Sequence, residues 1–172
     1  MELKVYKQKD LDENVFNKVE EVGKQIYDYC TQESTSNAFK EANKPGASSS
    51  LVQNVILNKA KELGFQSEKK GLFGDIPTSN LRPDYFLKIG RSGVIVEVER
   101  GKTIMNNMDI LDMWKCHLCS HANHLFLFVP LELKHNTSAR GYNPYNAVCN
   151  RMQPFFNLSN YTNVHSLWIF GY

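Results

Sequence analysis

The sequence has no long hydrophobic run and no N-terminal targeting signal. No stretch of the 172 residues approaches the roughly 18 uninterrupted apolar residues of a membrane-spanning helix. The opening segment, MELKVYKQKD, has no apolar region of the kind that signal peptides contain. These absences argue against a membrane partner, and they predict a soluble protein of the cytoplasm.

Cysteine is scarce, with four residues in the whole chain. A chain of this length can bury a core without covalent crosslinks, so Cys30, Cys116, Cys119 and Cys149 are predicted to be free thiols. The segment CHLCSHANH at 116–124 is dense in side chains that zinc accepts as ligands. Four ligands crowded onto one helix end have poor geometry, so a packed helix is favoured over a zinc site.

An excess of one charge sign is also absent. The net charge is +2, from 20 Lys+Arg and 18 Asp+Glu, which permits binding to nucleic acid but does not require it. The hydrophobic share of 42% and the charged share of 22% are typical of globular chains, which excludes a disordered one. The length favours a single domain over residues 1–172.

Hydrophobic periodicity predicts an α/β chain. Helices are expected where apolar residues recur every three or four positions, at 15–30, 50–63, 103–118 and 145–152. Strands are expected at 65–70, 85–89, 94–99, 124–130 and 164–170, and the turn at 90–93 joins two of them in a hairpin. The segment 31–50 is rich in Ser and Asn and contains Lys-Pro-Gly, so it is predicted to be a loop.

The helix at 103–118 is expected to pack through an apolar stripe. Its members are Met108, Leu111, Trp114 or Lys115, and Leu118, and its cap is Thr103 or Asn106. The strand that follows, 124–130, is continuously apolar and is predicted to be covered on both faces.

Acidic side chains interrupt an otherwise apolar predicted strand. Glu97 and Glu99 project from one face of the segment VIVEVE at 94–99, because side chains alternate along a strand. Asp84 stands thirteen positions before Glu97, at the start of the paired strand. The hairpin is therefore predicted to bring three carboxylates to one end of the sheet.

Such a group of carboxylates is costly without a counter-charge, because the groups repel one another and burial disfavours their charged form. Oxygen ligands suit a hard cation such as Mg²⁺, with Mn²⁺ as the alternative, and this cation accepts phosphate oxygens directly. It also polarises a scissile phosphate and makes bound water more acidic. A competing interpretation has about equal weight from the acids alone: Glu97 and Glu99 decorate the solvent face of an amphipathic strand, and Asp84 follows a loop proline.

Arg82-Pro83-Asp84, followed by Glu97-Val98-Glu99 after a hairpin, resembles the motif of the PD-(D/E)xK nuclease superfamily, which includes many type II restriction endonucleases. The similarity covers residues 51–130. It implies a restriction-endonuclease-like αβββαβ core with a mixed central sheet flanked by helices. It also implies that Asp84 and Glu97 are metal ligands, with the backbone carbonyl of Val98 as a further ligand.

On this interpretation one nuclease domain has three parts. Residues 1–50 form an N-terminal helix and loop, 51–130 the catalytic core, and 131–172 a C-terminal helix and strand.

The last motif position departs from the majority pattern, because Glu99 stands where most members have lysine. A minority branch of restriction enzymes also has Glu-x-Glu, so the resemblance is to that variant. Glu99 can act as a general base or as an outer metal ligand. Lys102 is a candidate for the missing positive charge. An additional upstream acid would be Glu62 or Glu68, although a solvated surface role is favoured for both.

Basic residues near the acids are candidates for contacts with the DNA backbone. They are Lys69, Lys70, Arg82 and Arg100, and their alternative role as ordinary solvated charges has equal weight. The segment GKT at 101–103 is not a phosphate-binding P-loop, since that motif needs a glycine where Val96 stands. Nucleotide binding is therefore not expected.

The sequence predicts a Mg²⁺-dependent endodeoxyribonuclease of a restriction system, which cuts double-stranded DNA at a short specific site. The resemblance further implies a homodimer, because proteins with two-fold symmetry match palindromic DNA. Two alternatives stay open. A structure-selective or repair nuclease of the same fold would carry similar acids, and a non-catalytic DNA-binding relative would explain the missing lysine.

Overall fold

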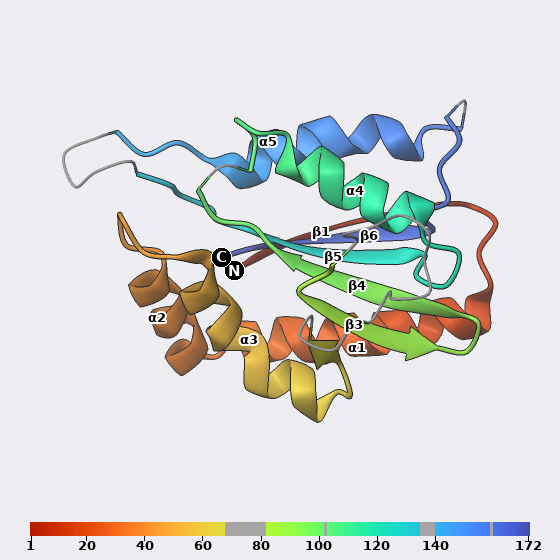
Figure 1. The fold of residues 1–172 in the computed structure, drawn as a ribbon, viewed down its shortest axis with the longest axis horizontal. Coiled ribbons are helices and arrows are strands. Elements are labelled where there is room, and N and C mark those ends of the chain that lie inside the picture. The colour runs from red at the N-terminus through yellow and green to blue at the C-terminus, as the bar shows by residue number, and fades with distance from the viewer. Residues whose placement is uncertain (68–81, 102, 135–139, 159) are drawn as a thin grey trace.

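A computed structural model describes residues 1–67, 82–101, 103–134, 140–158 and 160–172. In this part of the chain, one six-stranded sheet lies between two layers of helices (Figure 1). One face is covered by α4 (Met108–Leu118) and α5 (Pro144–Met152), which a 3-10 turn (Gln153–Phe156) extends, and the other by α1 (Glu13–Thr31), α2 (Glu33–Ala42) and α3 (Ser49–Glu62). The predicted α/β class, a mixed sheet flanked by helices, is confirmed.

The strands have the order β1-β6-β5-β4-β3-β2 in the sheet. β4, β5 and β6 are parallel to one another, whereas the other neighbouring pairs are antiparallel. The parallel step from β4 to β5 needs a crossover connection, which α4 supplies. The strands are β1 (Glu2–Lys7), β2 (Gln66–Ser67), β3 (Tyr85–Ile89), β4 (Ser92–Val98), β5 (His124–Val129) and β6 (Ser166–Gly171).

The order of elements from α3 to β5 is helix, strand, strand, strand, helix, strand, as predicted for residues 51–130. The hairpin of β3 and β4 is confirmed, and so are the helices predicted at 15–30, 50–63 and 145–152, each to within two residues. Asp12 caps α1, since its Oδ1 accepts hydrogen bonds from the backbone N–H groups of Asn14 and Val15. All four cysteines have free thiols, as predicted.

Two hydrophobic cores lie on the two faces of the sheet, and alternate residues of each strand enter different cores. On β4, Val94, Val96 and Val98 pack with the α1, α2 and α3 layer, while Ile95 packs with the α4 and α5 layer. Glu97 has the same parity as Ile95 and therefore faces α4. This alternation decides on which face of the sheet the acidic residues lie.

Two elements differ from the predictions for residues 1–50. The segment predicted as a loop contains α2, a ten-residue helix that buries Thr35, Phe39 and Ala42. Phe39 stacks on Tyr172 with ring centroids 5.1 Å apart, so contacts distant in sequence stabilise a helix whose own sequence is polar. The strand β1 was not predicted, and it pairs with β6 along its whole length, from Glu2–Gly171 to Lys7–Ser166.

The predicted packing face of α4 is wrong. Leu111, Trp114 and Leu118 are each about half exposed, at 49%, 52% and 50%. The residues that α4 buries are Asp109, Asp112, Met113 and Cys116. The helix is therefore rotated so that two carboxylates face the protein interior, where they need partners.

No helix in the described part of the chain is both long and apolar enough to cross a membrane.

Candidate metal site

Asp84 lies directly across the hairpin from Glu97. Its neighbour Tyr85 pairs with Val96 in the antiparallel ladder, and this register puts Asp84 opposite Glu97 on the face of the sheet that α4 covers. Asp84 Oδ2 accepts a hydrogen bond from the backbone N–H of Val98 at 2.8 Å. Its Oδ1 accepts another from Gln53 Nε2 on α3, also at 2.8 Å. The carboxylate is thus oriented from two sides.

Glu97 is almost fully buried beneath α4, at 4% exposure. Lys115 of α4 donates to Glu97 Oε1 at 2.9 Å, and the same ammonium lies 2.9 Å from Asp112 Oδ1. Residues three apart on a helix share a face, so Asp112 and Lys115 reach β4 together. The interpretation of Glu97 as a solvent-facing decoration is therefore wrong.

Glu99 follows the last residue of β4 and is held through its backbone. Its N–H donates to the carbonyl of Phe128, and its carbonyl accepts a hydrogen bond from the hydroxyl of Tyr172 at 2.8 Å. Its carboxyl interacts with that of Asp112. We call Asp84, Glu97, Glu99 and Asp112 the acidic cluster.

Burial and mutual repulsion disfavour negative charge throughout the acidic cluster. Burial raises the pKa of Asp84 to about 6, in opposition to the hydrogen bond from Val98. Burial, and then the charge of Asp112, raise the pKa of Glu99 to about 8 and hold that of Glu97 well above its usual range. Burial likewise raises the pKa of Asp112.

One ammonium offsets this charge only in part. Burial by itself would lower the pKa of Lys115, but the carboxylates of Glu97 and Asp112 outweigh it and raise that pKa. Four carboxyl groups against one ammonium leave an excess of negative charge when all are ionised. A divalent cation would reduce this excess.

The acidic cluster fits a metal that needs few protein ligands. Within the described residues, no group of three or more His, Cys, Asp or Glu side chains is arranged to hold a metal ion on its own. Mg²⁺ commonly uses one or two carboxylates and completes its shell with water and phosphate oxygens. The facing pair Asp84 and Glu97 meets that smaller requirement, and the backbone of Val98 lies beside it.

The basic residues predicted near the acids have different positions. The guanidinium of Arg100 donates to the carbonyls of Lys44 and Ala47, so it fastens the segment between α2 and α3 rather than extending toward solvent. Arg82 is exposed. Lys69, Lys70 and Lys102 lie outside the described residues, and so does Glu68. Glu62 is exposed and pairs with Lys59.

Sequence reasoning missed Gln53, Asp112 and Lys115. The detectable signal was on α4, where Asp109 and Asp112 are three positions apart and alternate with Met113 and Cys116 on one face. Reading the helix by its apolar residues alone assigned that face to solvent. Gln53 gives no such signal, because its role depends on how α3 packs against β3.

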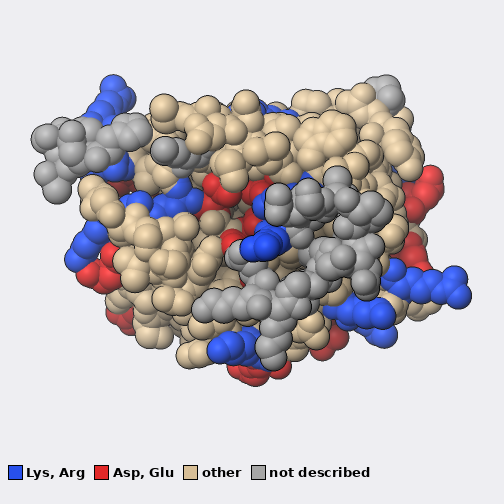
Figure 2. Space-filling model, in the orientation of Figure 1, with Lys and Arg blue, Asp and Glu red and all other residues tan. Residues whose placement is uncertain are grey.

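One face of the molecule has acidic side chains near its centre (Figure 2). Figure 2 shows acidic side chains gathered near the middle of this face, in a depression between the two helix layers, with Lys and Arg side chains on both sides. Negative and positive side chains therefore lie close together on this face (Figure 2).

A scan against protein-family models and a search of curated proteins give no match. The argument for function therefore depends on the site itself.

Proposed function

We propose that this chain is a divalent-metal-dependent nuclease of the PD-(D/E)xK type that hydrolyses DNA phosphodiester bonds. The observation that carries the proposal is the pair of facing carboxylates, Asp84 and Glu97, with the Lys115 ammonium 2.9 Å from Glu97 at the end of a parallel strand. The order of elements from α3 to β5 supports it, because it is the αβββαβ order that the sequence resemblance implies.

Asp84 and Glu97 would hold Mg²⁺, which supplies polarisation of the scissile phosphate and a more acidic bound water. Lys115 would stabilise negative charge that develops on the phosphate, since it is the described ammonium nearest these carboxylates. Glu99 would accept the proton of the attacking water in its ionised form, which its pKa of about 8 makes the minor form at neutral pH and the major form above pH 8. The phosphorus–oxygen bond to the leaving group then breaks, and the leaving oxygen takes a proton from solvent.

Lys115 also bears on the alternative of a non-catalytic relative. The main argument for lost activity is the glutamate at position 99 in place of lysine. An ammonium from α4 lies in contact with Glu97, so positive charge is present beside the acids although it comes from another element. The resemblance to restriction enzymes extends the proposal to a homodimer that cuts a short specific site.

A cleavage assay tests the proposal. The purified protein is incubated with plasmid DNA and with a branched DNA in Mg²⁺, Mn²⁺ or Ca²⁺, and Asp84→Asn and Glu97→Gln are compared with the surface control Glu62→Gln. The two cluster variants are expected to lose at least about 100-fold in cutting rate, because each removes a metal ligand. Circular dichroism checks that they remain folded.

Three outcomes separate the functions. Discrete plasmid fragments support a site-specific enzyme, and preferential cutting of the branched DNA supports a structure-selective one. Absence of cutting with every ion, or full activity in Asp84→Asn or Glu97→Gln, refutes the proposed chemistry. Calorimetric titration with Mn²⁺ gives a reading independent of activity, since binding should weaken in both cluster variants and persist in Glu62→Gln.

A further inference from the structure

A pocket lies at the carboxyl ends of β5 and β6. Its volume is about 390 Å³, within the range of small-molecule sites. Leu131 follows β5, Tyr172 follows β6, and both line it together with Phe39 of α2. In α/β sheets, ligands commonly bind outside the carboxyl ends of parallel strands.

Three lysines from separate segments surround this pocket, which we call the lysine-rimmed pocket. Lys40 comes from α2, Lys44 from the segment after it, and Lys134 from the segment after β5. One acidic residue, Glu132, is among the lining residues, so the lining carries an excess of positive charge. Its charge is therefore opposite to that of the acidic cluster.

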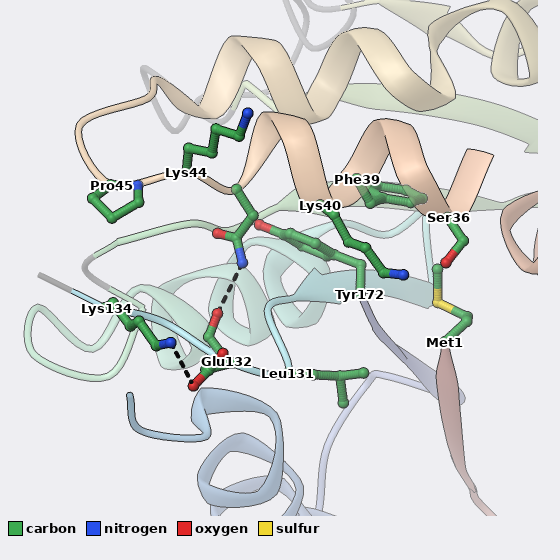
Figure 3. A pocket seen from close by; sticks show the side chains of 11 residues that line it. Met1, Ser36, Phe39, Lys40, Lys44, Pro45, Leu131, Glu132, Lys134 and Tyr172 are labelled. Carbon is green, nitrogen blue, oxygen red and sulfur yellow. Dashed lines mark hydrogen bonds and ion pairs between the residues drawn. The ribbon is translucent and has the colours of Figure 1, made fainter. Parts of the chain in front are cut away.

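Little stability is lost when these lysines reorient toward a bound anion. Figure 3 shows Lys40 extending from α2 beside Tyr172, and it makes no ion pair within the described part of the chain. Lys134 lies 3.4 Å from Glu132, and Lys44 pairs with Glu41. All four of these paired side chains are substantially exposed, and exposed ion pairs contribute little stability.

Two contacts connect the pocket to the acidic cluster. The hydroxyl of Tyr172 donates to the carbonyl of Glu99 at 2.8 Å, and the guanidinium of Arg100 donates to the carbonyl of Lys44. The segment of Glu99 and Arg100 therefore contacts two of the residues that line the pocket. A chain that has one phosphate at the acidic cluster could bring a neighbouring nucleotide into the pocket.

We propose that the lysine-rimmed pocket binds a nucleotide of the DNA strand that is cut, near the scissile phosphate. The lysines neutralise its phosphate, and the surface of Leu131 and Tyr172 packs against its sugar and base. This inference rests on the proposed function, since it assigns the occupant to the same DNA strand.

The test measures binding without cutting. The affinity of the full chain for a fluorescent duplex oligonucleotide is determined by anisotropy in Ca²⁺ at several NaCl concentrations. Lys40→Ala/Lys134→Ala is compared with Lys18→Ala/Lys24→Ala on α1. The two doubles are matched, because each removes one lysine with an ion pair to an exposed glutamate and one without.

The pocket double variant is expected to bind at least about 10-fold more weakly at low salt. Its plot of log affinity against log salt should be less steep by about 0.9, since contact with one phosphate is lost and each such contact changes that slope by about 0.9. The α1 double should keep the wild-type slope. A wild-type slope in the pocket variant, or equal losses in both doubles, overturns the inference.

A free nucleotide is the other source of the same chemistry. Calorimetric binding of deoxythymidine monophosphate that the pocket variant abolishes, with DNA binding unchanged, would assign the pocket to a free nucleotide and overturn the inference. Failure of the proposed function has a different signature. Pocket-dependent DNA binding without cutting in any divalent ion would refute the hydrolysis and support the pocket as a DNA site.

Discussion

Replacing Lys115 by methionine tests whether its ammonium stabilises the acidic cluster. The variant keeps an unbranched side chain and removes the charge that contacts Glu97 and Asp112, each at 2.9 Å. Removing one partner of a buried ion pair costs about 3–5 kcal/mol, because the remaining charges stay buried and unpaired. The Lys115 side chain is 22% exposed, so water relieves part of this cost and we expect the lower limit, about 3 kcal/mol.

This loss should depend on pH. The pKa values of all four cluster carboxyls are raised, so they take up protons as the pH falls and the unpaired negative charge disappears. In the variant these pKa values rise further, because the compensating ammonium is gone. The difference from wild type should therefore be largest at pH 8 and should shrink by pH 5.

Urea unfolding at the two pH values measures the effect, with Lys59→Met as the matched control. Lys59 is similarly covered, at 16% side-chain exposure, but its partner Glu62 is exposed at 67%. The control should lose at most about 1 kcal/mol. In thermal unfolding, Lys115→Met should lose about 6–12 °C at pH 8, from about 2–4 °C per kcal/mol for a chain of this size. Equal losses in the two variants, or no pH dependence, would refute the reasoning.

Three further perturbations test the electrostatics. Glu99→Gln is expected to raise the free energy of unfolding at pH 9 and to leave it unchanged below pH 4. Burial and then Asp112 raise the pKa of Glu99 to about 8, so the stability that its neutral form contributes is lost as the pH rises from the unfolded value of about 4.3 to about 8. A destabilised variant in urea titrations at pH 9 would contradict this. Burial, and then His165, lower the pKa of His124 to about 4, so this histidine should contribute a loss of about 3 kcal/mol between pH 7 and pH 4, as the unfolded chain takes up the proton first. His124→Asn should lose correspondingly less, and an identical pH profile would exclude this histidine as the cause. Mn²⁺ should raise the melting temperature more at pH 8 than at pH 6, since protons compete for the same carboxylates, and equal shifts in calorimetric scans would count against binding at the acidic cluster.

Local patterns predicted the elements that position the first two acids. The alternation in β4 and the short turn at 90–93 fix which residues share a face and which pair across the hairpin, so the facing of Asp84 and Glu97 follows from sequence alone. The periodicity of α1 and α3 is equally local. Elements whose stability comes from distant partners were missed. β1 depends on pairing with β6 at the other end of the chain, and α2 on packing against Tyr172.

The error at α4 has a specific physical origin. A hydrophobicity pattern treats every carboxylate as solvent-facing, yet α4 buries Asp109 against Arg151 at 3.4 Å and Asp112 against Lys115 at 2.9 Å. The apolar residues Leu111 and Trp114 lie on the opposite, half-exposed side. Burial of a charged residue is favourable only when partners are in place, and sequence periodicity contains no information on partners from other elements.

The position of Lys115 shows why a motif and a site are different things. A sequence motif records spacing along one strand, whereas electrostatic stabilisation depends only on where the charge lies relative to the reacting atoms. Met113 and Cys116 are buried and hold α4 against the sheet. This packing directs the side chains of Lys115 and Asp112 toward β4. The ammonium of Lys115 on α4 therefore lies beside Glu97, although position 99 has an acidic residue. If this reasoning holds, adding Glu99→Lys to Lys115→Met would not restore the wild-type free energy of unfolding at pH 8, because the new ammonium would approach from the strand end while Glu97 and Asp112 had lost their common partner.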